Sequence, residues 1–594
     1  LYTEDVFVAN SIDSFFYHIF AINKPMLIYF HNLKFDGSFI IPYLERIGYH
    51  NSVNYNGIPQ KIFGGSFSYM ISDKGRWYYI KIKTPNNKII EIRDSLNLLP
   101  FSVADIGDAF NTEHRKTSIE YTGFRKPGGK ISDIEENYIK NDVLVVKEAL
   151  EYMFDKGLKK MTIGSCALQK YKDSVSRETF DAYFPDLTQI VIDKDIYGSD
   201  TADKYIRKSY KGGFCYVSPE YKGKVCGRGL TLDVNSLYPS MMESESGNYY
   251  PIGEPIFGIG QPDLKEEYFY FLRLKATFKL KKNYLPTIQI KGNFLYLGNE
   301  WLHSSDIIIK GEHYKYYKKD DMIYYNMPEL TLSEVDYRLF LDHYQIENIQ
   351  YLDYCYFRKE IGIFDEFIHS EKLNKINAKT KAERTDAKLM SNNLYGKLAS
   401  SDLSSYKITY IDNETGIMRF ENVEQHNKPT VHIAAGAAVT SYARNFTIRH
   451  GQKNYKYFRY SDTDSLHLEC RKEDIVDINI HSANYQCWKL EGVWDKAIFA
   501  RQKTYMEHII EEDGEKLDKP YDLIKCAGMG KRPKELIAAR LSGKPIAKTK
   551  EEKKFLSTPM EYSDFKTGLK IPSQLRPKRM KSGVLLQSEI YEMK

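Results

Sequence analysis

Short apolar segments and amphipathic helices alternate along the first 170 residues. Met26 to Phe30 is an apolar and aromatic run of strand length, and Ile134 to Phe154 repeats apolar residues at helical spacing. Residues 215–510 alternate strand-like segments with one long helical segment, and the residues from 525 onward are basic and interrupted by prolines. The pattern predicts a mixed α/β chain that begins with a compact unit ending near residue 170.

Acidic residues stand at the ends of predicted strands in the middle of the chain. Leu230 to Asp233 is a short strand that ends in an acid, and the segment after it contains Pro and Ser and bends the chain. Residues 455–469 predict a β-hairpin with Asp462 and Asp464 at its tip. Side chains at i and i+2 of an extended segment share a face, so we expect both to point into one site with Asp233.

Three acids in one site indicate Mg²⁺, which prefers a few carboxylates together with water and substrate phosphates. The reaction that needs such a site is phosphoryl transfer by two metal ions about 4 Å apart. Glycosyltransferases also use an Asp-x-Asp metal site to hold a nucleotide diphosphate, and a DNA-binding scaffold with dead sites is a third alternative. The helix described next favours the first of these.

A helix is predicted from about Phe364 to Tyr395, ended by Gly396. Five polar residues three or four positions apart share one stripe of it, and three of them are cations. Such a stripe suits a surface that clamps a triphosphate and packs against a nucleotide. The members are Lys381, Arg384, Lys388, Asn392 and Tyr395.

Composition describes an ordinary globular protein, with 42% hydrophobic and 28% charged residues. No apolar run is long enough for a membrane span, and no targeting signal is present, so we expect a soluble intracellular protein. The seven cysteines are scattered and indicate neither disulfides nor zinc. From residue 525 onward, 17 Lys and Arg against seven Asp and Glu give a charge of +10, which leaves −4 for the rest of a chain of net +6. A basic terminal segment suits contact with a phosphate backbone.

Three segments resemble the palm and fingers motifs of family B DNA polymerases: residues 233–240, 388–396 and 460–465. Lys503-Thr504-Tyr505 resembles the motif that holds the primer strand, and Tyr210-Lys211-Gly212-Gly213 resembles the element that joins exonuclease and polymerase domains. Residues 29–37, 286–291, 501–505 and 525–529 are similar to the protein-primed members of the family. The resemblance covers nearly the whole chain.

The resemblance implies a right-hand polymerase with palm, fingers and thumb, an N-terminal RNase H-like 3′–5′ exonuclease domain and two protein-priming insertions. The implied divisions are an exonuclease domain 1–170, a linker and start of the palm 171–244, a first insertion 245–345, palm and fingers 346–399, a second insertion 400–432, palm 433–524 and a basic thumb 525–594. It implies strand-displacing synthesis by a monomer in the cytoplasm of an infected host, on template and primer DNA, with dNTPs and a terminal protein as primer and with no membrane contact.

The resemblance also assigns roles in polymerisation. Two Mg²⁺ ions, for which Mn²⁺ substitutes, are held by Asp233, Val234 and Asp464, with Asp462 in support. The incoming nucleotide contacts Val234, Tyr238, Lys375, Arg384, Lys388, Asn392 and Tyr395, where Tyr238 excludes a 2′-hydroxyl, Arg384 replaces the expected Lys, and Asn393 stands where Ser is usual. DNA contacts are assigned to Asn32, Phe35, Ser95, Leu96, Phe101, Tyr210, Gly212, Gly213, Arg501, Lys503, Tyr505 and Lys525.

The exonuclease site is incomplete in this sequence. Asp36 and Asp142 supply half of a second two-metal site, with Tyr138 to orient the attacking water and Lys116 as a further candidate. The Asp-x-Glu that the family supplies upstream does not occur in the 35 residues before Asp36, and Asp133-Ile134-Glu135 lies inside the helix that leads to Tyr138. We therefore expect little 3′–5′ degradation by this chain. The first residue is Leu1, which favours truncation over natural loss.

Overall fold

The computed structural model describes residues 6–119, 128–291, 295–296, 300–309, 312–319, 322–412, 414–415, 417–423, 426–427, 430–580 and 583–594. The chain divides into two compact units. The first unit is made of residues 1–174, 369–430 and 577–587. The second is made of residues 175–368, 431–576 and 588–594. Segments far apart in the sequence therefore build each unit.

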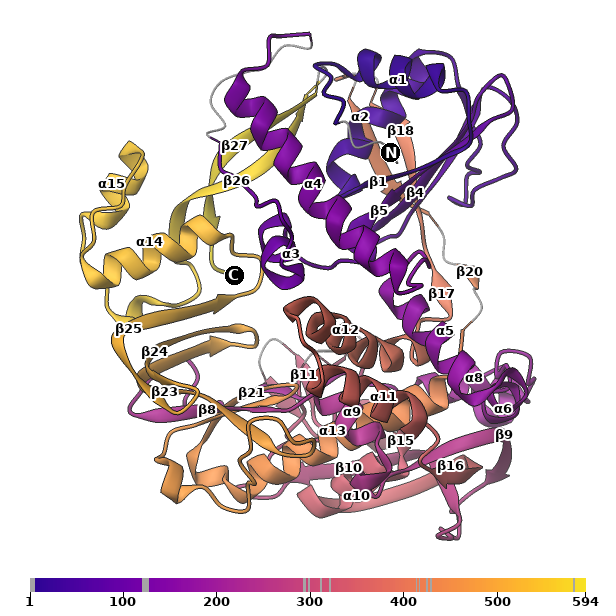
Figure 1. The fold of residues 1–594 in the computed structure, drawn as a ribbon. Coiled ribbons are helices and arrows are strands. Elements are labelled where there is room, and N and C mark those ends of the chain that lie inside the picture. The colour runs from indigo at the N-terminus through magenta and orange to yellow at the C-terminus, as the bar shows by residue number, and fades with distance from the viewer. Residues whose placement is uncertain are drawn as a thin grey trace. The chain divides into compact units, whose positions relative to one another are not determined.

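A five-stranded sheet forms the centre of the first unit (Figure 1). Its strands, in spatial order, are β1 (Met26–Phe30), β5 (Ile89–Asp94), β4 (Trp77–Lys83), β3 (Ser66–Ile71) and β2 (His50–Asn51). β1 pairs with β5 and β2 with β3 in parallel, and the other neighbours are antiparallel. The predicted strand from Met26 to Phe30 is confirmed as β1. The fully buried core under this sheet includes Phe16, Leu33, Ile41, Leu44, Phe67, Ile80 and Ile92.

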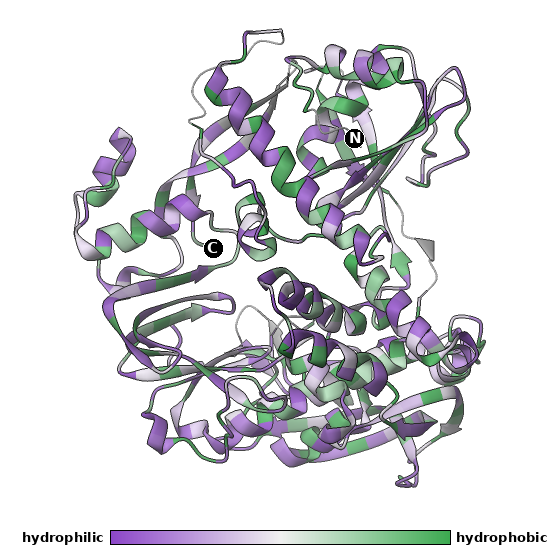
Figure 2. Cartoon of the chain, in the orientation of Figure 1, coloured by the Kyte–Doolittle hydropathy of each residue, from purple (hydrophilic) through white to green (hydrophobic). Residues whose placement is uncertain are grey.

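Five helices of the first unit come from its N-terminal segment. They are α1 (Ile12–Ala21), α2 (Leu33–Arg46), α3 (Val103–Phe110), α4 (Asp133–Asp155) and α5 (Ile163–Val175). α4 confirms the predicted helix, and hydrophobic and hydrophilic residues alternate along it (Figure 2). It begins with a capping box in which the Ser132 N–H donates to Glu135 Oε2 at 2.9 Å. Glu135 is therefore occupied in capping the helix, and Asp133-Ile134-Glu135 is not the missing acid pair.

The predicted single helix from Phe364 to Tyr395 is wrong, because the structure has two helices, α11 (Asp365–Ile376) and α12 (Lys381–Leu398). The break is caused by a second capping box. Thr380 Oγ1 accepts the Glu383 N–H at 3.2 Å, and Glu383 Oε2 accepts the Thr380 N–H at 3.3 Å, which starts a new helix. Gly396 does not end α12, which continues to Leu398.

Residues 400–432 add two small hairpins to the first unit. They are β17 (Leu403–Ser404) with β20 (His426–Asn427), and β18 (Lys407–Ile411) with β19 (Met418–Asn422). β18 lies against β3, where the Tyr69 hydroxyl accepts the Thr409 N–H at 2.9 Å. Met418 is buried in the core of the unit, and Phe420 packs edge-on against Trp77. The second predicted insertion is thus anchored on the N-terminal sheet.

The second unit is built on an eight-stranded sheet. Seven strands follow the order β25 (Glu515–Cys526), β24 (Thr504–Glu512), β23 (Trp488–Arg501), β8 (Gly229–Val234), β22 (Ser465–Leu468), β21 (Phe458–Asp462) and β6 (Cys215–Val217), and β7 (Val225–Cys226) pairs with β23. The predicted strand at Leu230 to Asp233 is confirmed as β8. The long helix α13 (Ile433–Lys453) is buried along most of its length, because alanine and other small residues let it pack closely.

A four-stranded antiparallel sheet lies within the same unit. Its strands, in order, are β15 (Glu329–Ser333), β10 (Tyr268–Leu280), β16 (Tyr344–Ile361) and β9 (Tyr249–Ile259), and α10 (Glu334–His343) joins β15 to β16. The small hairpins β11 (Ile307–Ile309) with β12 (Glu312–Tyr314), and β13 (Tyr316–Lys319) with β14 (Met322–Tyr325), precede β15. The sheet extends through β16 past the expected end of the first insertion at 345.

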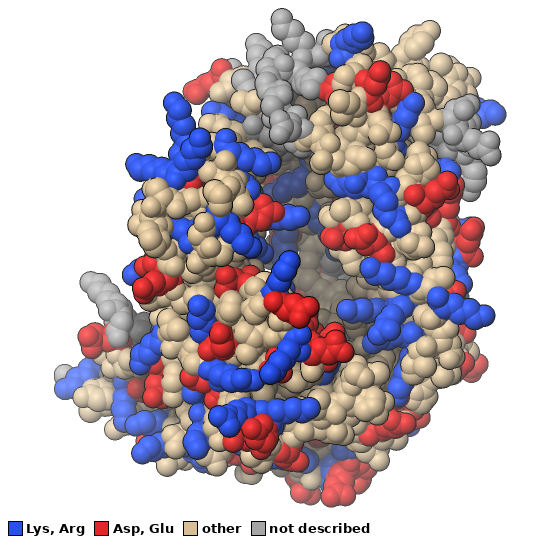
Figure 3. Space-filling model, turned by 60° about the vertical axis from the view of Figure 1, so that its left-hand side comes forward, with Lys and Arg blue, Asp and Glu red and all other residues tan. Residues whose placement is uncertain are grey.

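Short helices and a C-terminal hairpin complete the second unit. They are α6 (Arg177–Tyr183), α7 (Lys194–Tyr197), α8 (Ala202–Arg207), α9 (Leu237–Met242), α14 (Lys531–Ser542) and α15 (Lys550–Leu556), with the hairpin β26 (Lys570–Met580) and β27 (Gly583–Glu592), whose tip is grouped with the first unit. On the face drawn in Figure 3, Lys and Arg side chains are mixed with Asp and Glu. No helix in the described part of the chain is both long and apolar enough to cross a membrane.

Candidate active site

Asp233 lies at the end of β8, in the middle of the large sheet of the second unit. Leu232 and Val234 on either side of it are buried, so Asp233 points away from the core. Its neighbours across the two adjacent strands are Ser465 on β22 and Lys489 on β23. A strand end between two neighbours of the same sheet is a rigid place for a carboxylate.

The predicted hairpin is confirmed, although its first strand is β21 (Phe458–Asp462) rather than Tyr455 to Tyr460. Asp462 pairs with Ser465, so Thr463 and Asp464 alone form the turn. Thr463 has a left-handed φ of 64°. Asp464 is therefore a turn residue, and its side-chain direction is set by the turn instead of by strand alternation. The Asp464 carbonyl accepts the Val234 N–H at 2.8 Å, which fixes Asp464 next to the end of β8.

Lys503 neutralises Asp462. Its Nζ donates to Asp462 Oδ1 at 2.8 Å and to Oδ2 at 3.0 Å. Burial alone would lower the pKa of Lys503, but the pairing with Asp462 outweighs burial and raises it. The Lys503 backbone is left-handed, and its N–H donates to the Tyr460 hydroxyl at 2.9 Å. Asp462 is thus engaged by a cation.

The segment from Tyr210 to Gly213 reaches the turn from the other side. The Thr463 N–H donates to the Phe214 carbonyl at 2.7 Å. A Cβ atom on Gly213 would stand 2.5 Å from Thr463 Oγ1, far inside van der Waals contact. A glycine is therefore required at 213 for the chain to pass this closely to the turn.

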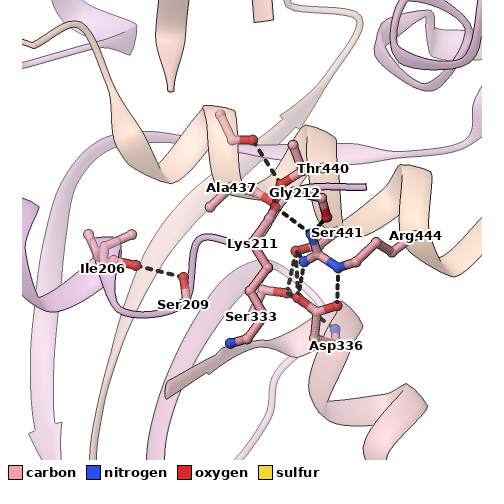
Figure 4. Close-up of polar contacts among 11 residues, drawn as sticks. Ile206, Ser209, Lys211, Gly212, Ser333, Asp336, Ala437, Thr440, Ser441 and Arg444 are labelled. Carbon is pink, nitrogen blue, oxygen red and sulfur yellow. Dashed lines mark hydrogen bonds and ion pairs between the residues drawn. The ribbon is translucent and has the colours of Figure 1, made fainter. Parts of the chain in front are cut away.

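A buried ion pair holds the backbone just before Gly213 (Figure 4). Arg444 on α13 donates to the carbonyls of Lys211 at 2.6 Å and Gly212 at 2.9 Å, and to Asp336 at the start of α10 at 2.6 Å. Ser441 also donates to Asp336, at 2.8 Å. Because Arg444 and Asp336 are buried, removing one would leave an uncompensated charge in the core. Sequence analysis did not identify either of them.

The charged groups in this cluster shift one another's pKa values. Burial lowers the pKa of Lys211 to about 8, Asp336 partly offsets that effect, and Arg444 adds to it. Burial would raise the pKa of Asp336, but Arg444 and Lys211 hold it below its ordinary value. Asp336 is therefore an anion between two cations, and the Lys211-Gly212 turn is fixed by electrostatics as well as by hydrogen bonds.

Tyr238 lies in the first turn of α9, directly after the site. Ser236 begins this helix with a left-handed φ of 53°, and Asn235 Nδ2 donates to the carbonyls of His481 at 2.7 Å and Asn484 at 3.0 Å. Leu237 and Pro239 are buried, and Tyr238 between them remains partly exposed. After the bend that follows Asp233, the ring of Tyr238 packs against the core of the second unit and remains partly exposed.

Three further predicted DNA contacts lie on strands of the same sheet near Lys503: Arg501 on β23, Tyr505 on β24 and Lys525 on β25. Arg501 pairs with Thr504 at the end of β23, and Tyr505 on β24 pairs with Lys525 on β25. Lys525 is exposed, and Arg501 and Tyr505 are partly exposed. These three predicted DNA contacts therefore share one region of the sheet with Lys503.

The predicted stripe lies on α12 in the first unit. Its cations Lys381, Arg384 and Lys388 are exposed and its members Asn392 and Tyr395 are partly exposed, so it is not a core face, as predicted. The pKa of Lys375 on α11 is lowered by burial and by the charges of Arg384 and Lys388, which places the three cations close together. Asn393 is turned away, since its Nδ2 donates to the Leu389 carbonyl at 2.7 Å.

The DNA contacts predicted for the N-terminal domain lie near the end of β1. Asn32 and Phe35, at the start of α2, are exposed. Leu96 and Phe101 are partly exposed, but Ser95 is fully buried and its hydroxyl donates to the Phe30 carbonyl at 3.0 Å. Ser95 therefore has no side-chain surface for DNA.

Asp94 is a residue of this region that sequence analysis missed. Its carboxylate is buried and accepts the N–H groups of Asn32 and Leu96, both at 3.0 Å. It ties together two segments that are 62 positions apart. Burial raises the pKa of Asp36 to about 6, and the negative charge of Asp94 adds to that effect.

Lys116, Tyr138 and Asp142 form a second group in the first unit. Lys116 Nζ lies 2.6 Å from Asp142 Oδ2 and 3.1 Å from the Tyr138 hydroxyl. The other Asp142 oxygen is buried and makes no hydrogen bond to the described residues. Lys116 is thus bound to the carboxylate of Asp142, which the sequence analysis predicts to be a metal ligand of the exonuclease site.

The donor set fits divalent metal better at the polymerase site than at the exonuclease site. Within the described part of the chain, no three His, Cys, Asp or Glu side chains converge on one metal position. Mg²⁺ needs only one or two carboxylates when substrate phosphates and water complete its shell, and Asp233 at a strand end and Asp464 in the adjoining turn would provide them. In the exonuclease region, Asp142 is bound to Lys116 and the burial of Asp36 opposes its ionisation.

Comparison with known proteins identifies the class. The family "DNA polymerase type B, organellar and viral" matches residues 19–132 and 124–483. The DNA polymerase of Bacillus phage B103 is 34% identical over 596 residues, which cover 99% of this chain and 94% of that protein. The DNA polymerase of Bacillus phage phi29 is 33% identical over 602 residues, covering 99% and 93%. The chain belongs to this family and is a DNA polymerase.

Solved structures agree with that assignment. Phi29 DNA polymerase complexed with primer-template DNA and incoming nucleotides has a TM-score of 0.80 and 32% identity, covering 98% of this chain and 93% of its own. The orthorhombic crystal form of phi29 DNA polymerase gives a TM-score of 0.82. The predicted fold class is confirmed: a mixed α/β polymerase with exonuclease, palm, fingers and thumb domains and two insertions.

Proposed function

We propose that this DNA polymerase replicates a linear viral genome from a protein primer, by two-metal nucleotidyl transfer with displacement of the non-template strand. The observation that carries the chemistry is the carboxylate of Asp233 at a strand end, fixed beside the two-residue turn of Asp464 by the hydrogen bond from Val234. Close relatives that are named DNA polymerases, all from phages, support the viral role.

Asp233, Asp464 and the carbonyl of Val234 would hold two Mg²⁺ ions, for which Mn²⁺ would substitute. When bound, the ions supply activation of the attacking hydroxyl and stabilisation of the pyrophosphate that leaves. Asp462 supports the site from one side, because Lys503 neutralises it and keeps the turn in place. Lys503 and Tyr505 would also contact the primer strand.

The stripe on α12 would hold the triphosphate of the incoming dNTP. Arg384, Lys388 and Lys375 supply the positive charge, and their mutual effect on the Lys375 pKa supports a shared anion site. Asn392 and Tyr395 would pack against the nucleotide, and Tyr238 would block a 2′-hydroxyl.

The two insertions would serve priming and processivity. Residues 245–345 would contact the terminal protein and the template, and residues 400–432 would close around the downstream strand. Both form ordered elements of their own, a β-sheet with α10 and a pair of hairpins, which supports functions separate from the catalytic sheet. We propose that the enzyme acts as a monomer in an infected host cell.

The decisive experiment is Mg²⁺-dependent primer extension by Asp233→Ala and Asp464→Ala. Both variants should lose nucleotide addition by at least a thousandfold and keep primer-template affinity within about threefold, because the acids serve chemistry more than duplex binding. Asp495→Ala is the matched control, since it removes an exposed acid of the same sheet that pairs with His508. Extension by Asp464→Ala at the wild-type rate would refute the assignment.

We further propose that this chain degrades single-stranded DNA poorly in the 3′–5′ direction. The engagement of Asp142 by Lys116 and the raised pKa of Asp36 support this proposal. The measurement is Mg²⁺-dependent shortening of a 5′-labelled oligonucleotide. Rapid shortening that disappears in Asp142→Ala would show that another acid completes the site.

A further inference from the structure

Two buried ionisable side chains lie directly behind the catalytic hairpin. Glu507 on β24 and His467 on β22 are both 0% exposed, and Glu507 Oε1 lies 2.6 Å from His467 Nδ1. Thr231 on β8 donates to the same oxygen at 2.9 Å. The pair therefore links three strands of the sheet by side-chain hydrogen bonds, in addition to the backbone ladder.

The pair is connected to the turn that carries the catalytic acids. His467 Nε2 lies 3.3 Å from Ser465 Oγ, and that hydroxyl oxygen accepts the Asp462 N–H at 3.3 Å. Ser465 is also the residue that pairs with both Asp462 and Asp233 across the sheet. A continuous path of hydrogen bonds thus leads from Glu507 to the backbone of Asp462, the residue just before the turn.

Aromatic rings surround the pair. The rings of Tyr460, Phe499 and Tyr505 lie 5.0 to 5.4 Å from the ring of His467. Burying a carboxyl group and an imidazole is unfavourable compared with filling the same volume with apolar side chains. Among the described residues, Thr231 and Ser465 are the side chains that hydrogen-bond to the pair, and Glu507 Oε2 has no hydrogen-bond partner.

The turn needs such support because it is short. Thr463 and Asp464 lie outside the strand ladder, so the ladder does not fix the direction of the Asp464 carboxylate. Ser465 is the first residue after the turn that belongs to the ladder. A group that fixes the Ser465 hydroxyl therefore limits how far the turn can tilt relative to Asp233.

We propose that Glu507 and His467 are positioning residues for nucleotidyl transfer. Glu507 orients the ring of His467, His467 orients Ser465, and Ser465 holds the turn so that Asp464 keeps its position beside Asp233. This inference rests on the proposed function of those two acids. Neither residue touches the reacting atoms.

The first test compares Glu507→Ala with Glu507→Gln, which keeps an oxygen that accepts from Thr231 and His467. For outer-shell partners of metal ligands such a loss costs about 10- to 100-fold, and we expect an effect of that size here. Glu507→Ala should lower kcat by that amount, with the KM for dNTP and the Kd for primer-template within about twofold of wild type, and Glu507→Gln should recover most of the loss. Glu511→Gln, a paired glutamate farther along the same strand, is the matched control.

The second test is a double-mutant cycle with Ser465→Ala, which leaves the Glu507–His467 contact intact. Ser465→Ala should lower kcat without lowering the melting temperature, and the double variant with Glu507→Ala should be no slower than the slower single variant. If Glu507→Ala does not fold, the kcat of the single variant Ser465→Ala decides the matter. Wild-type kcat in Ser465→Ala, or multiplicative losses in the double variant, would overturn the inference, whereas activity in Asp464→Ala would overturn the proposed function itself.

Discussion

The substitution Asp386→Asn is expected to stabilise the protein at neutral pH. Asp386 lies on α12, on the side away from the cationic stripe, and burial raises its pKa from 3.8 to about 6, with the charge of Glu371 adding to that effect. Glu371 on α11 is itself buried and forms an ion pair with Lys170 of α5. One oxygen of Asp386, Oδ1, has no hydrogen-bond partner among the described residues. The positive charges of Lys170 and Lys156 lower the pKa but do not outweigh burial and Glu371, so the negative charge of Asp386 is only partly compensated.

The magnitude follows from the pKa. A rise from 3.8 to about 6 corresponds to about 3 kcal/mol, at 1.36 kcal/mol for each tenfold change in proton affinity. The folded pKa lies above the unfolded one, so below about pH 4 the group is protonated in both states and costs nothing. Between pH 4 and 6 the unfolded state loses the proton first, stability falls as pH rises, and above pH 6 the full cost is present.

The assay is the thermal midpoint of Asp386→Asn and wild type between pH 4.5 and 8, with calorimetry to separate transitions, because a chain with two units need not unfold in one step. At pH 8 the midpoint of the variant should be higher by about 6–12 °C, from roughly 2–4 °C for each kcal/mol in units of this size, and the difference should shrink toward pH 4.5. Asp173→Asn, which changes an exposed aspartate of the same unit, is the control. An Asp386→Asn midpoint equal to or below wild type at pH 8, or a difference independent of pH, would refute the reasoning.

Three further expectations concern the polymerase reaction. Tyr238→Val should raise ribonucleotide incorporation in a competition assay with dNTPs, because a partly exposed ring next to the catalytic strand end no longer blocks the 2′-hydroxyl; unchanged sugar discrimination would remove Tyr238 from that role. Lys388→Ala should raise the KM for dNTP tenfold or more, since a charge-assisted contact to phosphate contributes roughly 1.5–3 kcal/mol. If the variant instead lost mainly affinity for DNA, α12 would belong to the template path. Gly213→Ala should lower kcat more than Gly212→Ala. The new methyl group at 213 would stand 2.5 Å from Thr463, whereas a methyl group at 212 would meet no atom within 4 Å. Equal rates for the two variants would contradict the required close approach.

Local sequence patterns predicted the elements whose reasons are local. The alternation of residues before Asp233 predicted the strand end, and the turn residues at 461–464 predicted the hairpin. Both predictions were possible because these elements depend only on residues that are close in the sequence. The cationic stripe of α12 was predicted for the same reason. The break between α11 and α12 was not predicted, although Thr380 and Glu383 have the spacing of a capping box in the sequence.

The supporting residues of the site were not predictable in this way. Arg444 and Asp336 are 108 positions apart, and His467 and Glu507 are 40 positions apart. Each is a charged or ionisable residue whose sequence neighbourhood suggests an ordinary helix or strand. Their burial, and so their importance, exists only after distant strands have paired and α13 has packed against α10.

The geometry of the turn at Thr463 and Asp464 explains why segments so far apart in the chain converge on it. A two-residue turn has little internal stabilisation, and Thr463 must hold a left-handed backbone that costs roughly 1 kcal/mol or more. Three segments compensate: the Phe214 carbonyl accepts the Thr463 N–H, Thr447 on α13 donates to the Thr463 carbonyl at 3.0 Å, and Lys503 binds Asp462. Because all three act on the adjacent residues Asp462 and Thr463, we expect their contributions to be coupled. The effects on kcat of substitutions in these three segments should therefore be non-additive, even though the segments are far apart in the sequence.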